Sequence, residues 1–370
     1  MRRRMVVVVL IVVVAAAVVV VAETTTGPAS SPTTVATRSS TTAPSPTSTT
    51  APSAHGPFAV GSLSLTVSEP AASGHAARTL TAYVRYPAVP GTGGSQTPAT
   101  PDRASGPFPL VLFSGGYAVS PEEYSTLLTA WAAAGYVVAD PVYPFTTPSS
   151  PGGLDESDIV HHPGDLSAVI TALLGDGAGA GVGAGGSAPT GTSDGAAGGP
   201  SGTLAGVIEP DEIAAIGHSD GGDVTLAAVA DPCCRDARIR AAVILSGAEY
   251  APFGGTYFST PTHFPLLVVQ GTGDDVNPEG CSVQLYDQAP RPKYYLSMAG
   301  QSHQGPYLEV GTPLDTVRRV TTDFLDGTLK GSAAALSAMT ADGNVPGSST
   351  LTAGTPTGLS AGSCPGAPGN

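Results

Sequence analysis

Charged side chains are scarce in this sequence, and positive ones are the scarcest. Only 12% of its 370 residues are charged, and 29 Asp and Glu outnumber 15 Lys and Arg, which gives a formal net charge of −14. Surfaces that bind nucleic acid or anionic membranes need clustered basic side chains, and no such patch stands out. We therefore expect neither as a partner, and we interpret the negative charge as that of a solvated, soluble surface. We also expect the protein to be a monomer.

Motifs for binding metals and phosphates are missing as well. The four cysteines form no C-x-x-C pair and no Cys/His spacing typical of zinc. A glycine-rich stretch at about residues 175–206 lacks G-x-x-x-x-G-K-[ST], and no strand leads into it, which excludes a phosphate-binding loop. We expect this stretch to be a flexible surface insertion, and we expect the protein to use no cofactor and no metal.

A long hydrophobic run occurs at the start of the chain. Arginines at positions 2–4 precede an apolar run over residues 5–21, and small residues follow at a possible cleavage site. This arrangement predicts a secretory signal peptide over residues 1–22, with an uncleaved membrane anchor as the alternative because the run is long. In either case we expect the rest of the chain to lie outside the cytoplasm. Residues 23–55 are rich in Thr, Ser and Pro, which predicts a disordered linker.

Residues 56–345 have the pattern of one α/β domain. Alternation of apolar and polar residues at 62–67 and 80–86 predicts an antiparallel opening pair of strands. Apolar runs typical of strands buried on both faces then alternate with helical segments. The predicted buried strands are 108–113, 136–139, 213–216, 241–245, 266–270 and 294–297, and the predicted helices are 122–134, 165–174, 223–230 and 313–325. This order predicts a mostly parallel central sheet with helices on both faces, followed by an irregular tail at 346–370.

One motif between a predicted strand and a predicted helix carries chemistry. Residues 217–221 read Gly-His-Ser-Asp-Gly, which has the form G-x-S-x-G. In a nucleophile elbow the serine occupies a strained strand-to-helix turn, so that its hydroxyl projects freely. Glycines are needed on both sides because a side chain there would collide with the neighbouring strand and helix. The motif predicts Ser219 as a nucleophile.

A nucleophilic serine needs a base, and the base needs an orienting acid. In an open α/β sheet these groups must meet at the carboxyl ends of the strands. Asp274 follows the predicted strand 266–270 directly and is the predicted acid. Asp275 is the alternative: adjacent side chains point apart, so only one of the two aspartates can face the histidine. Glu249, after strand 241–245, is a third possibility.

His303 is the predicted base. It lies in a polar, turn-rich loop after strand 294–297, which can bring an imidazole back over the serine. The other histidines lie in linkers or early loops, at the wrong edge of the sheet or, like His218, beside the serine where we expect packing. The order Ser219, Asp274, His303 is the order that this architecture uses.

An acyl-transfer intermediate also needs two N–H groups that bind its oxyanion. One is expected from Asp220, directly after the serine. The other is expected from Tyr117, in the turn after strand 108–113, where two glycines let the backbone approach closely. The aromatic side chains predicted to line the acyl pocket are Tyr117, Tyr143, Phe145 and Phe253.

These stretches carry a family resemblance. The chain is similar to the α/β-hydrolase superfamily, and within it to the dienelactone-hydrolase-like and cutinase/polyester-hydrolase-like secreted esterases of actinobacteria. The matching stretches are residues 112–117, 217–222, 271–274 with Pro278, and 302–303. The similarity covers roughly residues 58–345 without the insertion. It implies an α/β-hydrolase fold and ester hydrolysis through a Ser/His/Asp triad, without metal or organic cofactor.

Two departures from the polyester-hydrolase-like pattern narrow the expected substrate. Asp220 stands where such relatives commonly place methionine, and residues 249–253 lack the tryptophan that they carry after this strand. We therefore expect a secreted serine esterase acting on small-molecule, lipid or polymeric esters rather than a specialised polyesterase. An acyltransferase or peptidase on the same triad, or a noncatalytic binding module displayed on the cell wall, is the alternative.

The same topology favours one pairing of the cysteines. Cys233 and Cys234 follow the helix after the serine, so they should lie at the amino-terminal edge of the parallel sheet. Cys281 follows the strand that bears the acid and should lie at the opposite edge. We therefore expect a Cys281–Cys364 disulfide, with Cys233 and Cys234 free or joined as a vicinal pair.

Overall fold

The computed structural model describes residues 57–69, 76–94, 98–150, 152–175, 200–259, 263–362 and 364. The chain divides into two units, Met1–Pro52 and Ser53–Asn370, and only the second contains described residues. The predicted signal peptide, the linker at 23–55 and most of the insertion therefore lie outside the described residues. Among the helices that are described, none is long and apolar enough to cross a membrane.

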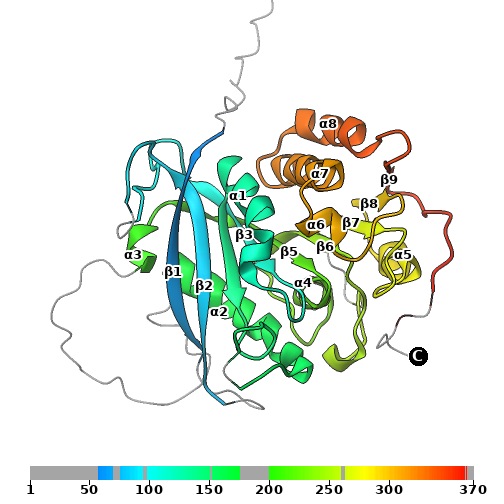
Figure 1. Cartoon of the computed structure of the whole chain (residues 1–370), viewed down its shortest axis with the longest axis horizontal. Helices are drawn as coiled ribbons and strands as arrows, with labels where there is room; N and C mark the ends of the chain where they lie inside the picture. Colours follow the sequence, from blue (N-terminus) through cyan, green and yellow to red (C-terminus); the bar gives the residue numbers. More distant parts are fainter. Residues whose placement is uncertain are drawn as a thin grey trace, which may run out of the picture. The chain divides into compact units, whose positions relative to one another are not determined.

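The second unit is an α/β fold built on one nine-stranded mixed sheet, with strand order β1-β2-β4-β3-β5-β6-β7-β8-β9 (Figure 1). Six neighbouring strands, β4, β3, β5, β6, β7 and β8, are parallel to one another. At one edge β2 pairs with β4 and β1 pairs with β2, and at the other edge β9 pairs with β8, each pair being antiparallel. The strands are β1 (Ala59–Glu69), β2 (Arg78–Ala88), β3 (Phe108–Ser114), β4 (Val137–Val142), β5 (Ile208–His218), β6 (Ile239–Leu245), β7 (Leu266–Gly271), β8 (Lys293–Met298) and β9 (Ser349–Ala353). The predicted antiparallel opening pair is confirmed, since β1 pairs with β2 along its full length.

Helices cover both faces of the sheet, as predicted. They are α1 (Ser125–Ala133), α2 (His162–Leu174), α3 (Pro200–Thr203), α4 (Asp220–Ala230), α5 (Glu279–Gln288), α6 (Gly305–Leu308), α7 (Thr312–Thr328) and α8 (Ala333–Gly343). In β3, Val111 and Phe113 pack into the core beneath α1 and α7, whereas Leu110 and Leu112 pack into the core beneath α2 and α4. Successive side chains of one strand therefore enter opposite cores. This is why the buried strands appear in the sequence as continuous apolar runs.

The parallel strands end together at one edge of the sheet. In register, Ser114 of β3 pairs with Gly217 of β5, and Gly217 pairs with Ile244 of β6. Gly271 of β7 pairs with Met298 of β8. The loops that follow these strands therefore converge at the carboxyl edge, where open α/β sheets bind their ligands.

Two expectations about irregular segments need correction. The tail at 346–370 is not irregular throughout, because β9 adds to the outer edge of β8 in antiparallel register from Tyr294 to Met298. Its polar sequence hides this strand, which forms because β8 offers an unpaired row of backbone groups. The end of the glycine-rich insertion is also ordered, since α3 forms there and the side chain of Leu204 is buried.

Both pairs of cysteines form disulfides. Cys281 pairs with Cys364, as predicted, and Cys233 pairs with its neighbour Cys234, the second of the two possibilities left open for that pair. Cys281 lies in α5, so the first bridge ties the end of the chain to the helix that follows β7.

The Cys281–Cys364 bridge should contribute most of the stability that the disulfides supply. It joins residues 83 positions apart, whereas the other bridge joins residues 1 position apart and hardly restricts the unfolded chain. We expect the Cys281→Ser/Cys364→Ser variant to lose about 2–4 kcal/mol in the free energy of unfolding. We expect the matched Cys233→Ser/Cys234→Ser variant to lose less than about 1 kcal/mol. Urea unfolding checks both, and the opposite ranking would contradict the assignment.

Candidate active site

The turn between β5 and α4 holds Ser219 in an unusual backbone conformation. Its φ is 56° and its ψ is −127°, a region that residues with side chains rarely adopt. Hydrogen bonds fix the backbone on both sides: Ser219 N–H donates to the Leu245 carbonyl at 3.0 Å, and the Ser219 carbonyl accepts from Gly222 N–H at 2.7 Å. The strain is thus held in place by the sheet and by the first turn of α4.

The glycines of the motif are required by close backbone contacts. A Cβ on Gly217 would lie 1.8 Å from the Gly221 carbonyl oxygen, and a Cβ on Gly221 would lie 1.9 Å from the Ser114 carbonyl oxygen. A Cβ on Gly222 would lie 2.9 Å from the Cα of Gly247. The first two contacts are far below any real Cβ distance, so β3, β5 and α4 meet here without room for a side chain.

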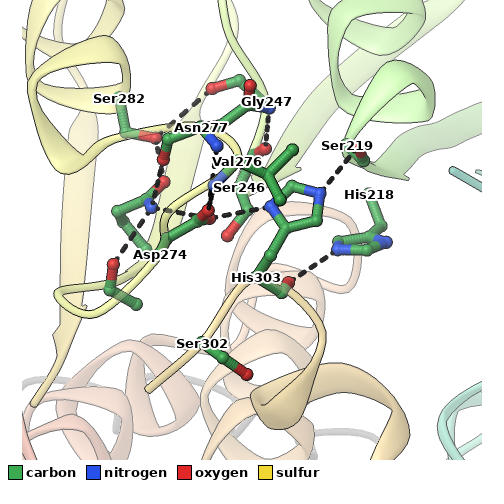
Figure 2. Close-up of polar contacts among 12 residues, drawn as sticks. His218, Ser219, Ser246, Gly247, Asp274, Val276, Asn277, Ser282, Ser302 and His303 are labelled. Atoms are coloured by element: carbon green, nitrogen blue, oxygen red, sulfur yellow. Dashed lines mark hydrogen bonds and ion pairs between the residues drawn. The ribbon is translucent and has the colours of Figure 1, made fainter. Parts of the chain in front are cut away.

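The structure brings the three predicted residues together (Figure 2). His303 Nε2 lies 2.8 Å from Ser219 Oγ, and His303 Nδ1 lies 2.8 Å from Asp274 Oδ2. Ser219 follows β5, Asp274 follows β7, and His303 follows β8, so three loops at the same sheet edge supply them. The imidazole is thereby held at both nitrogens, between an acid and a hydroxyl.

Asp274 is held as an ionised acceptor. Its Oδ1 accepts from the N–H groups of Val276 and Asn277, both at 2.9 Å, and its Oδ2 accepts from Gln270 Nε2 at 3.0 Å. Burial by itself raises the pKa of Asp274, but His303 and the N–H groups of Asn277 and Val276 outweigh it and lower the pKa below its ordinary value.

The tautomer of His303 follows from this. An ionised carboxylate can only accept, so Nδ1–H of His303 donates to Asp274. Nε2 is left with its lone pair towards Ser219 and can accept the hydroxyl proton. The runner-up acid, Asp275, is exposed, and Glu249 contacts Gln284 instead of the imidazole.

Sequence reasoning missed the residues that support Asp274. Gln270, the polar residue near the end of the otherwise apolar β7, donates to Asp274 and also to the carbonyls of Gly271 and Asn277. Asn277 Nδ2 donates to the Ser246 carbonyl at 2.7 Å, which ties the acid's turn to the end of β6. A buried glutamine closing an apolar strand was the available signal for Gln270.

The two predicted oxyanion donors lie beside the serine. Asp220 follows it directly, and a Cβ on Gly116, next to Tyr117, would lie 3.1 Å from Ser219 Cβ. Within the described part of the chain, the Tyr117 N–H donates to no other residue, whereas the Asp220 N–H contacts the carboxyl group of its own side chain. The Tyr117 amide is therefore available to a ligand at Ser219, and the Asp220 amide becomes available when its own carboxyl group turns away.

The neighbours of Tyr117 are fixed by hydrogen bonds. Gly116 N–H donates to Tyr124 Oη at 3.0 Å, and Ala118 N–H donates to the Thr146 carbonyl at 2.8 Å. Val119 N–H closes the turn onto the Gly116 carbonyl at 3.3 Å. The Tyr117 amide is thus held between two anchored neighbours.

The carboxyl group of Asp220 is poorly supported. Its Oδ2 is buried and has no hydrogen-bond partner among the described residues. Burial and the nearby charge of Glu156 raise the pKa of Asp220 to about 6, although His303 acts in the opposite direction. Two residues on, Asp223 accepts from Ala248 N–H at 2.6 Å, and burial together with Asp220 raises its pKa as well.

Two of the four aromatic residues expected to line an acyl pocket have almost no exposed surface. Tyr143 is buried: its ring stacks on His162 with centroids 3.8 Å apart, and its hydroxyl lies 2.8 Å from Ser114 Oγ. Phe253 is buried in the core on the α2/α4 side. Tyr117 is partly exposed and Phe145 is 40% exposed, so only these two remain accessible to a ligand.

The chain matches no protein-family model and no curated protein. Among the described residues, no group of three or more His, Cys, Asp and Glu side chains is placed to hold a metal ion.

The close contact at Gly221 gives a direct test of the turn. We expect Gly221→Ala to lower the free energy of unfolding by about 3 kcal/mol or more, because its Cβ overlaps the Ser114 carbonyl. Gly202→Ala is the matched control, since a Cβ there meets nothing within 4 Å, and it should change stability by less than about 0.5 kcal/mol. Equal urea midpoints for the two variants would contradict the geometry.

Asp220 should make stability depend on pH. Its pKa in the folded state, about 6, is above the ordinary 3.8, so the folded state is destabilised as pH rises through this interval. Asp220→Asn should therefore add about 1–3 kcal/mol to the free energy of unfolding above pH 7 and almost nothing near pH 4.

The control for this measurement is Asp275→Asn, which changes an exposed carboxylate nearby. A stability difference for Asp220→Asn that is the same at both pH values would contradict the assignment.

Proposed function

We propose that this protein is a serine hydrolase that cleaves carboxylic esters through an acyl-enzyme intermediate. The observation that carries the proposal is the continuous hydrogen bonding from Asp274 through His303 to Ser219, at 2.8 Å in each step. A chain of acid, imidazole and hydroxyl at this spacing is what activates a serine for attack on a carbonyl.

The mechanism follows from the protonation states. Ser219 Oγ attacks the ester carbonyl carbon while His303 Nε2 takes its proton, and Asp274 stabilises the imidazolium that forms. The N–H groups of Tyr117 and Asp220 bind the oxyanion. His303 then gives its proton to the departing alkoxide, which leaves as the alcohol. The acyl group remains bound to Ser219 Oγ.

Deacylation repeats these steps with water. His303 takes a proton from water as its oxygen attacks the acyl carbon, and returns a proton to Ser219 Oγ as the carboxylic acid leaves. Each cycle restores the starting protonation states. No group beyond these five residues and water is required by this route.

The fold class that we propose is the α/β-hydrolase fold. It is supported by the parallel strands β3 to β8, the antiparallel opening pair, and the glycine-flanked Ser219 between β5 and α4. It is also supported by the chain order of the serine, acid and base, each after a different strand.

We further propose that the enzyme acts outside the cytoplasm. The sequence-based expectation of a signal peptide supports this, and so do the two disulfides, which persist in oxidising compartments. Its substrates would be small-molecule, lipid or polymeric esters, bound without a cofactor.

The test uses the full chain and p-nitrophenyl esters of increasing acyl length. We expect turnover and covalent labelling of Ser219 by a fluorophosphonate probe. Ser219→Ala should lose the labelling and at least about a thousandfold in kcat, because the nucleophile is gone. Full turnover by Ser219→Ala would rule the proposal out, and an unlabelled, inactive parent protein would favour a noncatalytic role.

Two neighbouring aspartates provide a matched control. Asp274→Asn should lower kcat by about 10³ to 10⁴, because an amide no longer fixes the productive tautomer of His303. Asp275→Asn changes an exposed side chain and should leave kcat within about twofold.

A further inference from the structure

A second hydrogen-bonded chain runs behind Ser219. Gly116 N–H donates to Tyr124 Oη at 3.0 Å, and Tyr124 Oη lies 2.7 Å from His218 Nδ1. His218 Nε2 in turn lies 2.9 Å from the backbone carbonyl oxygen of His303. Figure 2 draws this contact as a dashed line. The chain therefore starts one residue before Tyr117 and ends on the backbone of the predicted base.

The direction of each hydrogen bond is determined. A carbonyl oxygen only accepts, so His218 Nε2 carries the proton and donates to His303. His218 Nδ1 must then accept, and the proton comes from the Tyr124 hydroxyl. Tyr124 Oη keeps a lone pair for Gly116 N–H, so the donors and acceptors of the chain match from end to end.

The chain is buried and does not change charge at neutral pH. The side chains of Tyr124 and His218 are fully buried. Burial, with a smaller effect of His303, lowers the pKa of His218 to about 3, and burial raises the pKa of Tyr124 above its ordinary value. At fully buried positions the loss of one member leaves its neighbour without a hydrogen bond, so breaking any hydrogen bond of the chain is costly.

The rings also pack against the base. The His218 ring lies 4.9 Å from the His303 ring and 4.8 Å from the Tyr307 ring, measured between centroids. Tyr307 is itself anchored, since its hydroxyl donates to the Val269 carbonyl at 3.0 Å and lies 2.9 Å from Ser246 Oγ. His218 cannot rotate without breaking contacts to the loop of His303.

We propose that Tyr124 and His218 are positioning residues, which hold the Tyr117 turn and the His303 loop at a fixed separation across Ser219. The proposal rests on the proposed esterase function, because it assigns Tyr117 the role of oxyanion donor and His303 that of base. Neither Tyr124 nor His218 touches the substrate. They act by fixing Gly116, the anchored neighbour of Tyr117, relative to the backbone of His303.

The decisive variant is Tyr124→Phe, which removes one hydroxyl and leaves the ring packing in place. We expect kcat to fall about 10- to 100-fold with KM within about twofold, because a misplaced donor weakens the transition state more than the bound ester. The affinity for a trifluoromethyl ketone, whose adduct with Ser219 places an oxyanion in the site, should fall by the same factor as kcat/KM.

Tyr86→Phe is the matched control. Tyr86 is fully buried, and its hydroxyl donates to the Ala99 carbonyl at 2.8 Å, so this variant also loses one hydrogen bond to a buried tyrosine. It should keep kcat within about twofold. Similar melting temperatures for the two variants would show that a difference in kcat does not reflect a general loss of stability.

A double-mutant cycle tests whether the two residues act as one chain. His218→Leu alone should lower kcat at least as much as Tyr124→Phe, and the double variant should be no worse than His218→Leu. Titration with the fluorophosphonate corrects each rate for the fraction of active protein, so that partial misfolding of His218→Leu does not affect the comparison.

The outcomes are separable. Wild-type kcat for Tyr124→Phe, or kcat losses that multiply in the double variant, would overturn the positioning role while leaving the esterase proposal intact. A parent protein that neither turns over esters nor reacts with the fluorophosphonate would instead overturn the proposed function, and with it this inference.

Discussion

The candidate site depends on one steric constraint, the approach of three backbone segments at the end of β5. Gly217 and Gly221 leave no space for a Cβ, so α4 begins almost in contact with the end of β3. This contact forces Ser219 into its positive φ and aims its hydroxyl at the sheet edge. It also brings the turn after β3 to the serine. A looser junction would separate Tyr117 from Ser219 even with every side chain unchanged.

Electrostatics then separates the carboxyl groups that share this edge. Asp274 receives hydrogen bonds from two backbone N–H groups, a glutamine and an imidazole, and its pKa falls. Oδ2 of Asp220 is buried and has no hydrogen-bond partner among the described residues, and the pKa of Asp220 rises. Burial pushes both pKa values upwards; at Asp274 the imidazole and the N–H donors outweigh it, whereas at Asp220 the charge of Glu156 adds to it.

Local sequence signals predicted much of the site because the backbone enforces them locally. The glycines around Ser219, the aspartate directly after β7 and the histidine after β8 each follow from strand ends, and the Cys281–Cys364 pairing follows from the same topology. The features that were missed depend on partners distant in sequence. The polar strand β9 forms only because β8 has a free edge, and the burial of Tyr143 depends on its stacking against His162. Nothing in the local pattern of either segment specifies its partner.

His218, between Gly217 and Ser219, is a residue whose role depends on partners that are distant in sequence. Its position in the motif predicts only that it packs, and the structure confirms the packing, since His218 is fully buried. Burial of an imidazole is costly unless both nitrogens are satisfied, and the partners that satisfy them come from residue 124 and residue 303. An apolar residue would pack equally well without needing either partner. A buried histidine instead needs a hydrogen-bond partner at each nitrogen, which Tyr124 and the backbone of His303 supply. These two hydrogen bonds offset the cost of burial, and they also fix the Tyr117 turn and the His303 loop relative to each other.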